Sequence, residues 1–233
     1  MSAAPRFFVP RGTVAAPRFA LPGEIEHQVR RVLRLRDGAE LIVLEGDGHE
    51  TRCRLEGAGC VPIERRVSRG EPRHRLVVWQ ALLKGDHLAQ VIEHGTEVGV
   101  AAFRLVVSER CVARDLSARR LERLRAIARE AAEQSERGAV PPVAEPVSVA
   151  DIPWPTTVML AERHEAAGLG ELAAREPPGA LAIGPEGGWV PSELAAAVGS
   201  GARLAGLGPR ILRSETVAVA AAAVVLSRTG DFA

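Results

Sequence analysis

The sequence contains no tyrosine and no asparagine, and only one of its 30 lysine and arginine residues, Lys84, is a lysine. Codons for lysine, asparagine and tyrosine are AT-rich, so a GC-rich genome accounts for the shortage. The single lysine excludes a P-loop, because G-x-x-x-x-G-K-[ST] needs a glycine directly before the lysine and Leu83 stands there. The chain therefore has no phosphate-binding loop of that type, and nearly all its cations are arginines.

Cysteines and long apolar runs are also scarce. The three cysteines, Cys53, Cys60 and Cys111, form no C-x-x-C pair, which argues against both a zinc site and a disulfide framework. The longest apolar run, 217–226, is half the roughly 20 residues that a membrane-spanning helix needs. The N-terminus lacks the hydrophobic core of a signal peptide. We therefore expect a cytoplasmic protein without a metal or a membrane span.

The composition is otherwise that of a globular protein, with 233 residues, 46% of them hydrophobic and 25% charged. Residues 1–72 carry 12 arginines against 10 acidic side chains, and residues 73–233 carry 18 cations against 19 acids. Net charge thus gives no sign of nucleic-acid binding. Arginine clusters at 30–36 and 119–125 are local exceptions, although such runs more often form a solvated helix face.

The pattern of predicted elements changes near residue 72. Before it, short apolar runs predict several strands, with one helix and a glycine-rich turn at 45–48. The predicted strands are 6–9, 40–44, 51–55 and 61–67, and the helix is 24–35. This combination predicts a small β-barrel module.

From residue 73, strands alternate with helices. The predicted strands are 74–82, 102–107, 157–161, 180–183 and 202–207. Two predicted helices begin after Asp86 and at Pro191, and two more span 117–137 and 216–227. Alternation of this kind predicts an α/β domain with a mostly parallel sheet covered on both faces.

Two segments that follow predicted strands are candidates for a site. Residues 183–189 hold three glycines and a proline, which allow the backbone to approach a ligand closely, although a tight loop without a ligand fits equally well. In residues 207–216, Arg210 and Arg213 favour a polar or anionic ligand. Ser214 or Thr216 is expected to cap the following helix, with Glu215 in its first turn.

Other chemistries lack support. The spacing of 183–189 is not G-x-G-x-x-G, the fingerprint of dinucleotide-binding domains. His87 and His94 lie seven residues apart on one predicted helix face, which offers too few convergent ligands for a metal. No serine-hydrolase motif is present.

An ordered set of motifs extends over nearly the whole chain. They are Arg6-Phe7-Phe8, His27-x-x-Arg30-x-x-Leu33-Arg34, Lys84-Gly85-Asp86, 96–100, Ser108-Glu109-Arg110, 130–137, 183–188 and 207–216. In this set the chain resembles the ribosomal RNA small subunit methyltransferase E family of the SPOUT superfamily. The family often has lysine where His94 stands, tryptophan at Leu124 and threonine at Ser214.

The resemblance implies a PUA-like β-barrel over 1–72 that binds RNA, and a SPOUT methyltransferase domain over 73–233 with a C-terminal trefoil knot. It also implies S-adenosylmethionine as cofactor, a homodimer, and 16S rRNA or the small ribosomal subunit as partner. The implied cofactor-binding residues are Leu160, Ile183, Gly184, Pro185, Glu186, Gly187, Gly188, Leu207, Gly208, Ile211, Leu212 and Arg213. The implied RNA-binding residues are Arg6, Arg30, Arg34 and Lys84.

The implied reaction is methyl transfer to N3 of a uridine in 16S rRNA. The N3 proton must leave and the developing anion must be stabilised, and the polar candidates are Arg213, Arg210 and Glu215. We assign anion stabilisation to Arg213. Trp189 or Trp79 offers a stacking face for the unstacked base, although burial in the core is the more common role for tryptophan.

Two alternatives are considered. Ribose 2′-O methyltransferases of the superfamily end in a Ser-Leu-Asn-Val-type segment, whereas this chain has Ser214-Glu215-Thr216-Val217 and no asparagine, which favours base methylation. The other alternative is a non-catalytic RNA-binding module. The intact glycine-rich segment 184–188 argues against it.

Overall fold

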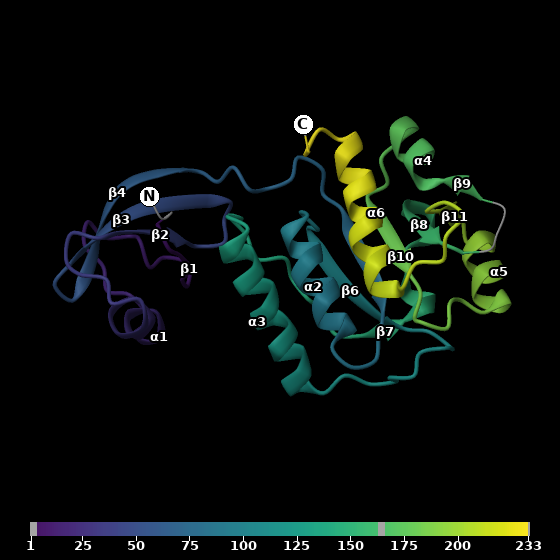
Figure 1. Cartoon of the computed structure of the whole chain (residues 1–233), viewed down its shortest axis with the longest axis horizontal. Coiled ribbons are helices and arrows are strands. Elements are labelled where there is room, and N and C mark those ends of the chain that lie inside the picture. The colour runs from purple at the N-terminus through teal and green to yellow at the C-terminus, as the bar shows by residue number, and fades with distance from the viewer. Residues whose placement is uncertain (1–3, 163–165, 233) are drawn as a thin grey trace. The chain divides into compact units, whose positions relative to one another are not determined.

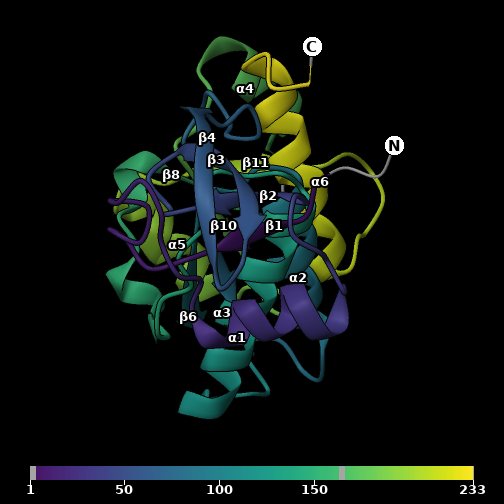
Figure 2. The same cartoon turned by 90° about the vertical axis from the view of Figure 1, so that its left-hand side faces the viewer.

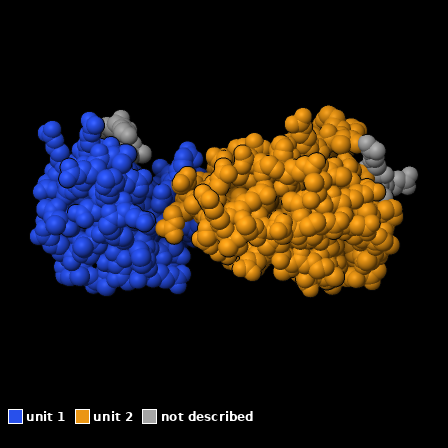
Figure 3. All heavy atoms as spheres, turned by 90° about the horizontal axis from the view of Figure 1, so that it is seen from below, with its two compact units in different colours: residues 1–71, 132–140 blue, residues 72–131, 141–233 orange. Residues whose placement is uncertain are grey.

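The computed structural model describes residues 4–162 and 166–232, which divide into two compact units (Figure 3). Unit 1 comprises the chain up to Glu71 together with Ala132–Val140. Unit 2 comprises Pro72–Ala131 together with the chain from Pro141 onward. The short segment 132–140 thus packs with the N-terminal part of the chain, which no sequence pattern indicates.

Unit 1 is built on a four-stranded sheet in the order β1-β2-β3-β4. The strands are β1 (Arg6–Phe8), β2 (Glu40–Leu44), β3 (His49–Glu56) and β4 (Gly59–Val67). β1 is parallel to β2, and the other two pairs are antiparallel. Figure 2 shows the long β3–β4 hairpin of this unit. The four predicted strands are confirmed to within two residues at each end.

The connections of unit 1 follow from its glycines and its one helical segment. The predicted turn at 45–48 joins β2 to β3, and Gly46 and Gly48 take φ values of +70° and +83° that favour glycine. The predicted helix is a short α-helix, α1 (Gly23–His27), that continues as a π-helical turn over Gln28–Val32. Phe19 adds an antiparallel bridge to Cys60 on β4. Closure of this sheet into a barrel stays a prediction.

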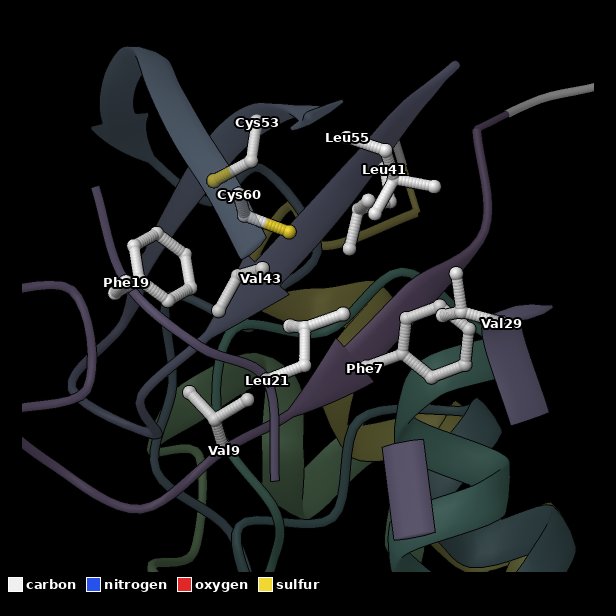
Figure 4. Close-up of a cluster of buried hydrophobic side chains, with 10 residues drawn as sticks. All are labelled: Phe7, Val9, Phe19, Leu21, Val29, Leu41, Val43, Cys53, Leu55 and Cys60. Carbon is white, nitrogen blue, oxygen red and sulfur yellow. The ribbon is translucent and has the colours of Figure 1, made fainter. Parts of the chain in front are cut away.

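Strand β2 is buried on both faces. Leu41 and Val43 belong to the hydrophobic cluster drawn in Figure 4, whereas Ile42 and Leu44 pack with Phe8 and Ala132 in a second cluster. Successive side chains of a strand point to opposite faces. The unbroken apolar run of β2 is therefore explained by a core on each side of the sheet, one of them completed by the segment 132–140.

Two cysteines lie within the first cluster. Cys53 and Cys60 are fully buried and free, and their side chains lie among the apolar groups in Figure 4. Burial raises the pKa of Cys53 to about 12, helped by the neighbouring Cys60, and burial raises the pKa of Cys60 to about 11. Both thiols are therefore uncharged at neutral pH and act as small apolar side chains.

A buried carboxylate ties the parts of unit 1 together. Glu50, which is 3% exposed, accepts hydrogen bonds from Arg6 Nη1 at 2.7 Å and from Arg66 Nε at 2.6 Å. Arg6 also donates to Glu136 at 3.0 Å, in the segment 132–140. Burial alone raises the pKa of Glu50, but the hydrogen bonds from Arg6 and Arg66 outweigh it and hold the pKa below its ordinary value.

We expect Glu50→Gln to lower the free energy of unfolding by about 2 kcal/mol at neutral pH, because it weakens two charge-assisted hydrogen bonds to a buried group. The folded-state pKa lies below the unfolded-state value, so the carboxylate stabilises the fold above the unfolded-state pKa. That contribution is lost as the pH falls through the folded-state pKa. Urea denaturation should show a difference between wild type and variant that is largest above about pH 5 and shrinks in acid.

The control is Glu64→Gln, since the carboxylate of Glu64 is 52% exposed and lies 3.4 Å from Arg52. This exposed pair should contribute less than about 0.5 kcal/mol. Equal stability of Glu50→Gln and the wild-type protein at neutral pH would contradict the structural role of Glu50.

Unit 2 contains a seven-stranded sheet in the order β7-β6-β5-β10-β8-β11-β9, in which all the neighbouring pairs are parallel. In chain order the strands are β5 (Val77–Ala81), β6 (Ala102–Val107), β7 (Val147–Ser148), β8 (Thr157–Leu160), β9 (Ala167–Gly168), β10 (Ala180–Ile183) and β11 (Arg203–Gly206). Because they are parallel, their carboxyl ends meet at one edge of the sheet. The predicted parallel α/β architecture is confirmed.

Among the described residues, five α-helices accompany this sheet. Figure 1 labels them. They are α2 (His87–Glu97), α3 (Ala118–Gln134), whose last residues belong to unit 1, α4 (Leu169–Arg175), α5 (Pro191–Gly199) and α6 (Ser214–Arg228). Helix α6 packs against both α2 and α4. Its buried residues are Ser214, Ala218, Ala221, Ala222, Val225 and Leu226, so the alanine- and valine-rich run is largely a packing surface, as its composition favours.

Some details differ from expectation. Asp86 precedes α2, but its side chain makes no capping hydrogen bond and instead lies 3.3 Å from Arg123. The short elements β7, β9 and α4 were not predicted, because two-residue strands and a seven-residue helix carry too little periodicity.

Candidate functional site

A cavity of about 1210 Å³ lies in unit 2, where three strands of the sheet end. Its walls are the ends of β8, β10 and β11 with the segments that follow them, 160–162, 183–189 and 205–213. The first turn of α6 adds Ser214, Glu215 and Val217. Ligands of open α/β sheets bind at the carboxyl ends of the strands, so this is the expected position for a site.

The segment after β10 is held in a tight turn around a tryptophan. The amide of Gly188, at φ +69°, donates to the carbonyl of Pro185 at 2.9 Å. Trp189 is buried, and its indole Nε1 donates to the carbonyl of Leu160 at 3.0 Å. A Cβ on Gly184 would lie 3.2 Å from Nε1 of that indole. Glycine at 184 therefore lets the indole bridge the ends of β10 and β8, and it favours the core role for Trp189.

Arg110 braces the same turn from the loop after β6. Its Nη1 donates to the carbonyl of Gly187 at 2.9 Å, and a Cβ on Gly187 would lie 3.2 Å from Cβ of Arg110. Arg110 was not predicted as a site residue. The signal that could have found it is the motif Ser108-Glu109-Arg110 at the end of a predicted strand.

Ser214 does not cap α6, contrary to expectation. The residue at the N-cap is Arg213, without a capping side-chain hydrogen bond. The hydroxyl of Ser214 donates instead to the carbonyl of Gly184 at 2.6 Å and accepts from Nε2 of the buried Gln80 at 3.0 Å. The start of α6 is thereby fixed to the turn after β10. Thr216, the other predicted cap, lies exposed within the helix.

The segment 207–213 is the most exposed wall. Gly208 has φ +91°, and a Cβ there would meet open space. Arg210 and Arg213 are exposed, and no hydrogen bond or ion pair of either guanidinium occurs within residues 4–162 and 166–232. Both arginines line the cavity and are therefore available to an anionic group in it.

Glu215 lies in the first turn of α6, as predicted, and faces a histidine. Its Oε1 is 3.2 Å from Nδ1 of His87, the first residue of α2. The side chain of Glu215 is 14% exposed and that of His87 is 41% exposed. Both residues line the cavity, and His87 was not predicted as part of this site.

Lys84 adjoins the cavity through its backbone. Its amide donates to Oε1 of Glu186 at 2.9 Å, and its side chain is exposed. The carboxylate of Glu186 is thus engaged in holding the segment before α2 against the turn after β10. The backbone of Lys84 is thereby held next to a residue that lines the cavity.

The residues predicted to bind the cofactor or to act in catalysis all line this one cavity. The three arginines predicted to bind RNA in unit 1 are placed differently. Arg6 is bound to Glu50 and Glu136, and Arg30 donates to the carbonyl of Gly57 at 2.5 Å and pairs with Asp37 at 2.8 Å. These contacts favour a structural role for both arginines. Arg34 is exposed at φ +55°, a conformation unusual for a side-chain-bearing residue.

The cavity suits a ligand that is recognised mainly by backbone and apolar groups. Glycines at 184, 187, 206 and 208 expose peptide groups, and Leu160, Ile183, Leu207 and Ile211 supply apolar surface. No group of three or more metal-ligating side chains is found in the described part of the chain. Within the same residues, no helix combines the length and the apolar character needed to cross a membrane.

Comparison with known proteins gives consistent matches along the chain. Residues 70–226 match a family described as an RNA methyltransferase domain, and residues 29–59 match an RNA methyltransferase PUA domain. Ribosomal RNA small subunit methyltransferase E from Bacillus subtilis is 32% identical, covering 92% of this chain and 91% of its own length. The protein of the same name from Mycobacterium tuberculosis is 37% identical, covering 85% of this chain and 80% of its own.

A solved structure is similar over the whole length. Ribosomal RNA small subunit methyltransferase E from Neisseria gonorrhoeae, bound to S-adenosyl methionine, superposes with a TM-score of 0.87 at 30% identity. The match covers 96% of this chain and 97% of that one.

Proposed function

The chain belongs to the ribosomal RNA small subunit methyltransferase E family, and from this we propose that it methylates N3 of a uridine in 16S rRNA. As a member of that family it is an rRNA methyltransferase that uses S-adenosylmethionine. The observation that carries the proposal is the cavity at the carboxyl ends of β8, β10 and β11. Glycine backbone, a carboxylate and two arginines that have no partner among the described residues converge there. No metal ligand set is required for this chemistry.

The predicted cofactor-binding residues fit S-adenosylmethionine. We assign the adenosine to the backbone and apolar groups of Leu160, 183–188 and 207–212, since these offer peptide donors and acceptors beside apolar surface. Bound there, the cofactor supplies a methyl group that its sulfonium charge activates. The hydrogen bonds of Trp189 and Ser214 keep the three segments in place before the cofactor binds.

The remaining tasks concern the uracil. Its N3 carries a proton that must leave, and the negative charge that develops must be stabilised where water is excluded. Arg213 lines the cavity, and we assign it to that charge, with Arg210 beside it. Glu215, in the first turn of α6, is the carboxylate that follows Arg213 on the same helix.

The finer features of the fold remain part of this proposal: a barrel in unit 1, a C-terminal trefoil knot and a homodimer in the cytoplasm. The strand order supports the knot. In the sheet, β8 lies between β10 and β11. After β11 the chain nevertheless returns to the end of β10, where the hydroxyl of Ser214 donates to the carbonyl of Gly184. The half-buried Val219, Ala220 and Ala223 of α6 support a close-packed partner subunit.

Lys84 is our candidate for a contact to an RNA phosphate beside the site. We expect Lys84→Gln to reduce the slope of log K against log salt for binding to 16S rRNA by about 1, because one phosphate contact is lost. Filter-binding titrations over a range of salt concentrations measure this slope. Arg175→Gln, which removes an exposed cation 2.6 Å from Glu171 on α4, is the matched control and should leave the slope unchanged.

Nucleoside analysis tests the function itself. Ribosomal RNA from a strain lacking this protein should lack N3-methyluridine at one position, and purified protein with S-adenosylmethionine should restore it. Restoration of a 2′-O-methyl nucleoside instead would favour the ribose-methylating alternative. Failure of the protein to bind S-adenosylmethionine in calorimetry would favour the non-catalytic RNA-binding alternative.

A further inference from the structure

A histidine and a carboxylate from two different helices meet in the wall of the cavity. His87 is the first residue of α2, and Glu215 lies in the first turn of α6, which packs against α2. Nδ1 of His87 is 3.2 Å from Oε1 of Glu215. The roles assigned to Arg213, Arg210 and Glu215 leave His87 without a part in the reaction.

The two nitrogens of this imidazole are in different surroundings. Nδ1 is buried beside Glu215 and has no other partner within the described residues. The ring as a whole is nevertheless 41% exposed and lines the cavity, so its exposed surface lies on atoms other than Nδ1. An imidazole that gives its Nδ1 hydrogen to a carboxylate presents Nε2 as a free acceptor. The arrangement therefore directs the basic nitrogen away from Glu215.

Glu215 is placed to hold the imidazole. It sits in the first turn of α6, and its Oε1 lies 3.2 Å from Nδ1 of His87. Neutral imidazole is an efficient proton acceptor near physiological pH. The contact to Nδ1 is not aligned as a hydrogen bond in this structure, and such contacts commonly tighten when substrate binds.

We propose that His87 is the general base of the methyl transfer, with Glu215 as the positioning residue that fixes its tautomer and orientation. This inference rests on the proposed function. Nε2 of His87 takes the proton from N3 of the uracil, and the electron pair left on N3 forms the new bond to the methyl carbon. The bond between that carbon and sulfur breaks, its electron pair stays on sulfur, and S-adenosylhomocysteine leaves.

Other charged groups lie on the neighbouring segments or line the same cavity. They are Lys84 and Asp86 before α2, Arg120 and Arg123 on α3, Arg110, Glu186, Arg210 and Arg213.

The first test compares single variants under saturating S-adenosylmethionine. We expect His87→Ala to lower kcat for 16S rRNA by about 100- to 10,000-fold and to leave the Kd for the cofactor within about twofold. His87→Gln, which keeps a polar side chain near Glu215, should be similarly slow. His94→Ala is the matched control, because His94 is an exposed histidine later on the same helix.

The second test uses readouts that a purely structural role would not change. Added imidazole should partly restore the rate of His87→Ala, and the fall in wild-type kcat on the acid side of neutrality should disappear in that variant. Glu215→Gln should be slow, and the double variant should be no slower than His87→Ala, because residues that act as one unit are not additive.

An active wild-type enzyme with an equally active His87→Ala variant would overturn this inference alone. So would a slow His87→Ala variant that imidazole does not rescue and that keeps the acid limb. A wild-type protein that binds S-adenosylmethionine but does not methylate rRNA would overturn the proposed function, and the inference with it.

Discussion

Replacing Arg213 with alanine should lower kcat for 16S rRNA by about 100- to 1000-fold, the loss expected when one preorganised donor to a developing anion is removed. Arg213 stands at the N-cap of α6 and lines the cavity, and its guanidinium is committed to no other group among the described residues. Because it stabilises charge that exists only during the transfer, its removal should leave the Kd for S-adenosylmethionine within about twofold. Single-turnover kinetics with calorimetry measure the two quantities separately.

The control for Arg213→Ala is Arg175→Ala, which removes a 79% exposed arginine from α4. Its kcat should match that of the wild-type protein. If Arg213→Ala weakens cofactor binding as much as it slows turnover, Arg213 acts in binding the cofactor and the assignment to the uracil anion is wrong.

Replacing Gly184 with valine should raise the Kd for S-adenosylmethionine by about 100-fold, which corresponds to nearly 3 kcal/mol. A Cβ at this position already lies 3.2 Å from the indole of Trp189, and the two methyl groups of valine extend further. The indole must then move, and its hydrogen bond to the carbonyl of Leu160 is lost. Since that bond joins two walls of the cavity, its loss changes the shape of the cofactor-binding cavity.

Gly199→Val is the matched substitution, because a Cβ on Gly199 meets nothing within 4 Å. It should leave the Kd for the cofactor unchanged. Thermal unfolding of both variants distinguishes a local change in the cavity from general destabilisation. Unaltered cofactor affinity of a folded Gly184→Val variant would show that the turn after β10 does not hold the cofactor.

The sequence was sufficient to predict the parallel α/β architecture and to select the walls of the cavity. Both follow from local signals. Apolar runs such as 102–107 and 180–183 mark buried parallel strands, and glycine-rich segments that follow strands mark the places where a backbone can approach a ligand. Residues 183–189 were selected in this way, whereas 207–216 were selected for Arg210 and Arg213, and Leu160 followed only from the family resemblance. Residues of all three segments line one cavity.

What could not be predicted depends on contacts between distant segments. Periodicity does not report which strands pair, so nothing local indicates that β10 lies between β5 and β8. Ser214 has the sequence context of a helix cap, but its hydroxyl donates instead to the buried carbonyl of Gly184. His87 was considered only as a metal ligand, because its partner Glu215 is 128 residues away in the chain.

The segment 132–140 determines when unit 1 can be completed during synthesis. Ala132 belongs to the cluster of Phe8, Ile42 and Leu44, and Glu136 binds Arg6. A nascent chain that ends near residue 72 has made all four strands of the sheet but still exposes one of its apolar faces. At about 5–20 residues per second, the ribosome needs several more seconds to supply the missing segment. We therefore expect unit 1 to finish folding only after the first part of unit 2, Pro72–Ala131, has been translated, and a fragment that stops at residue 72 to aggregate.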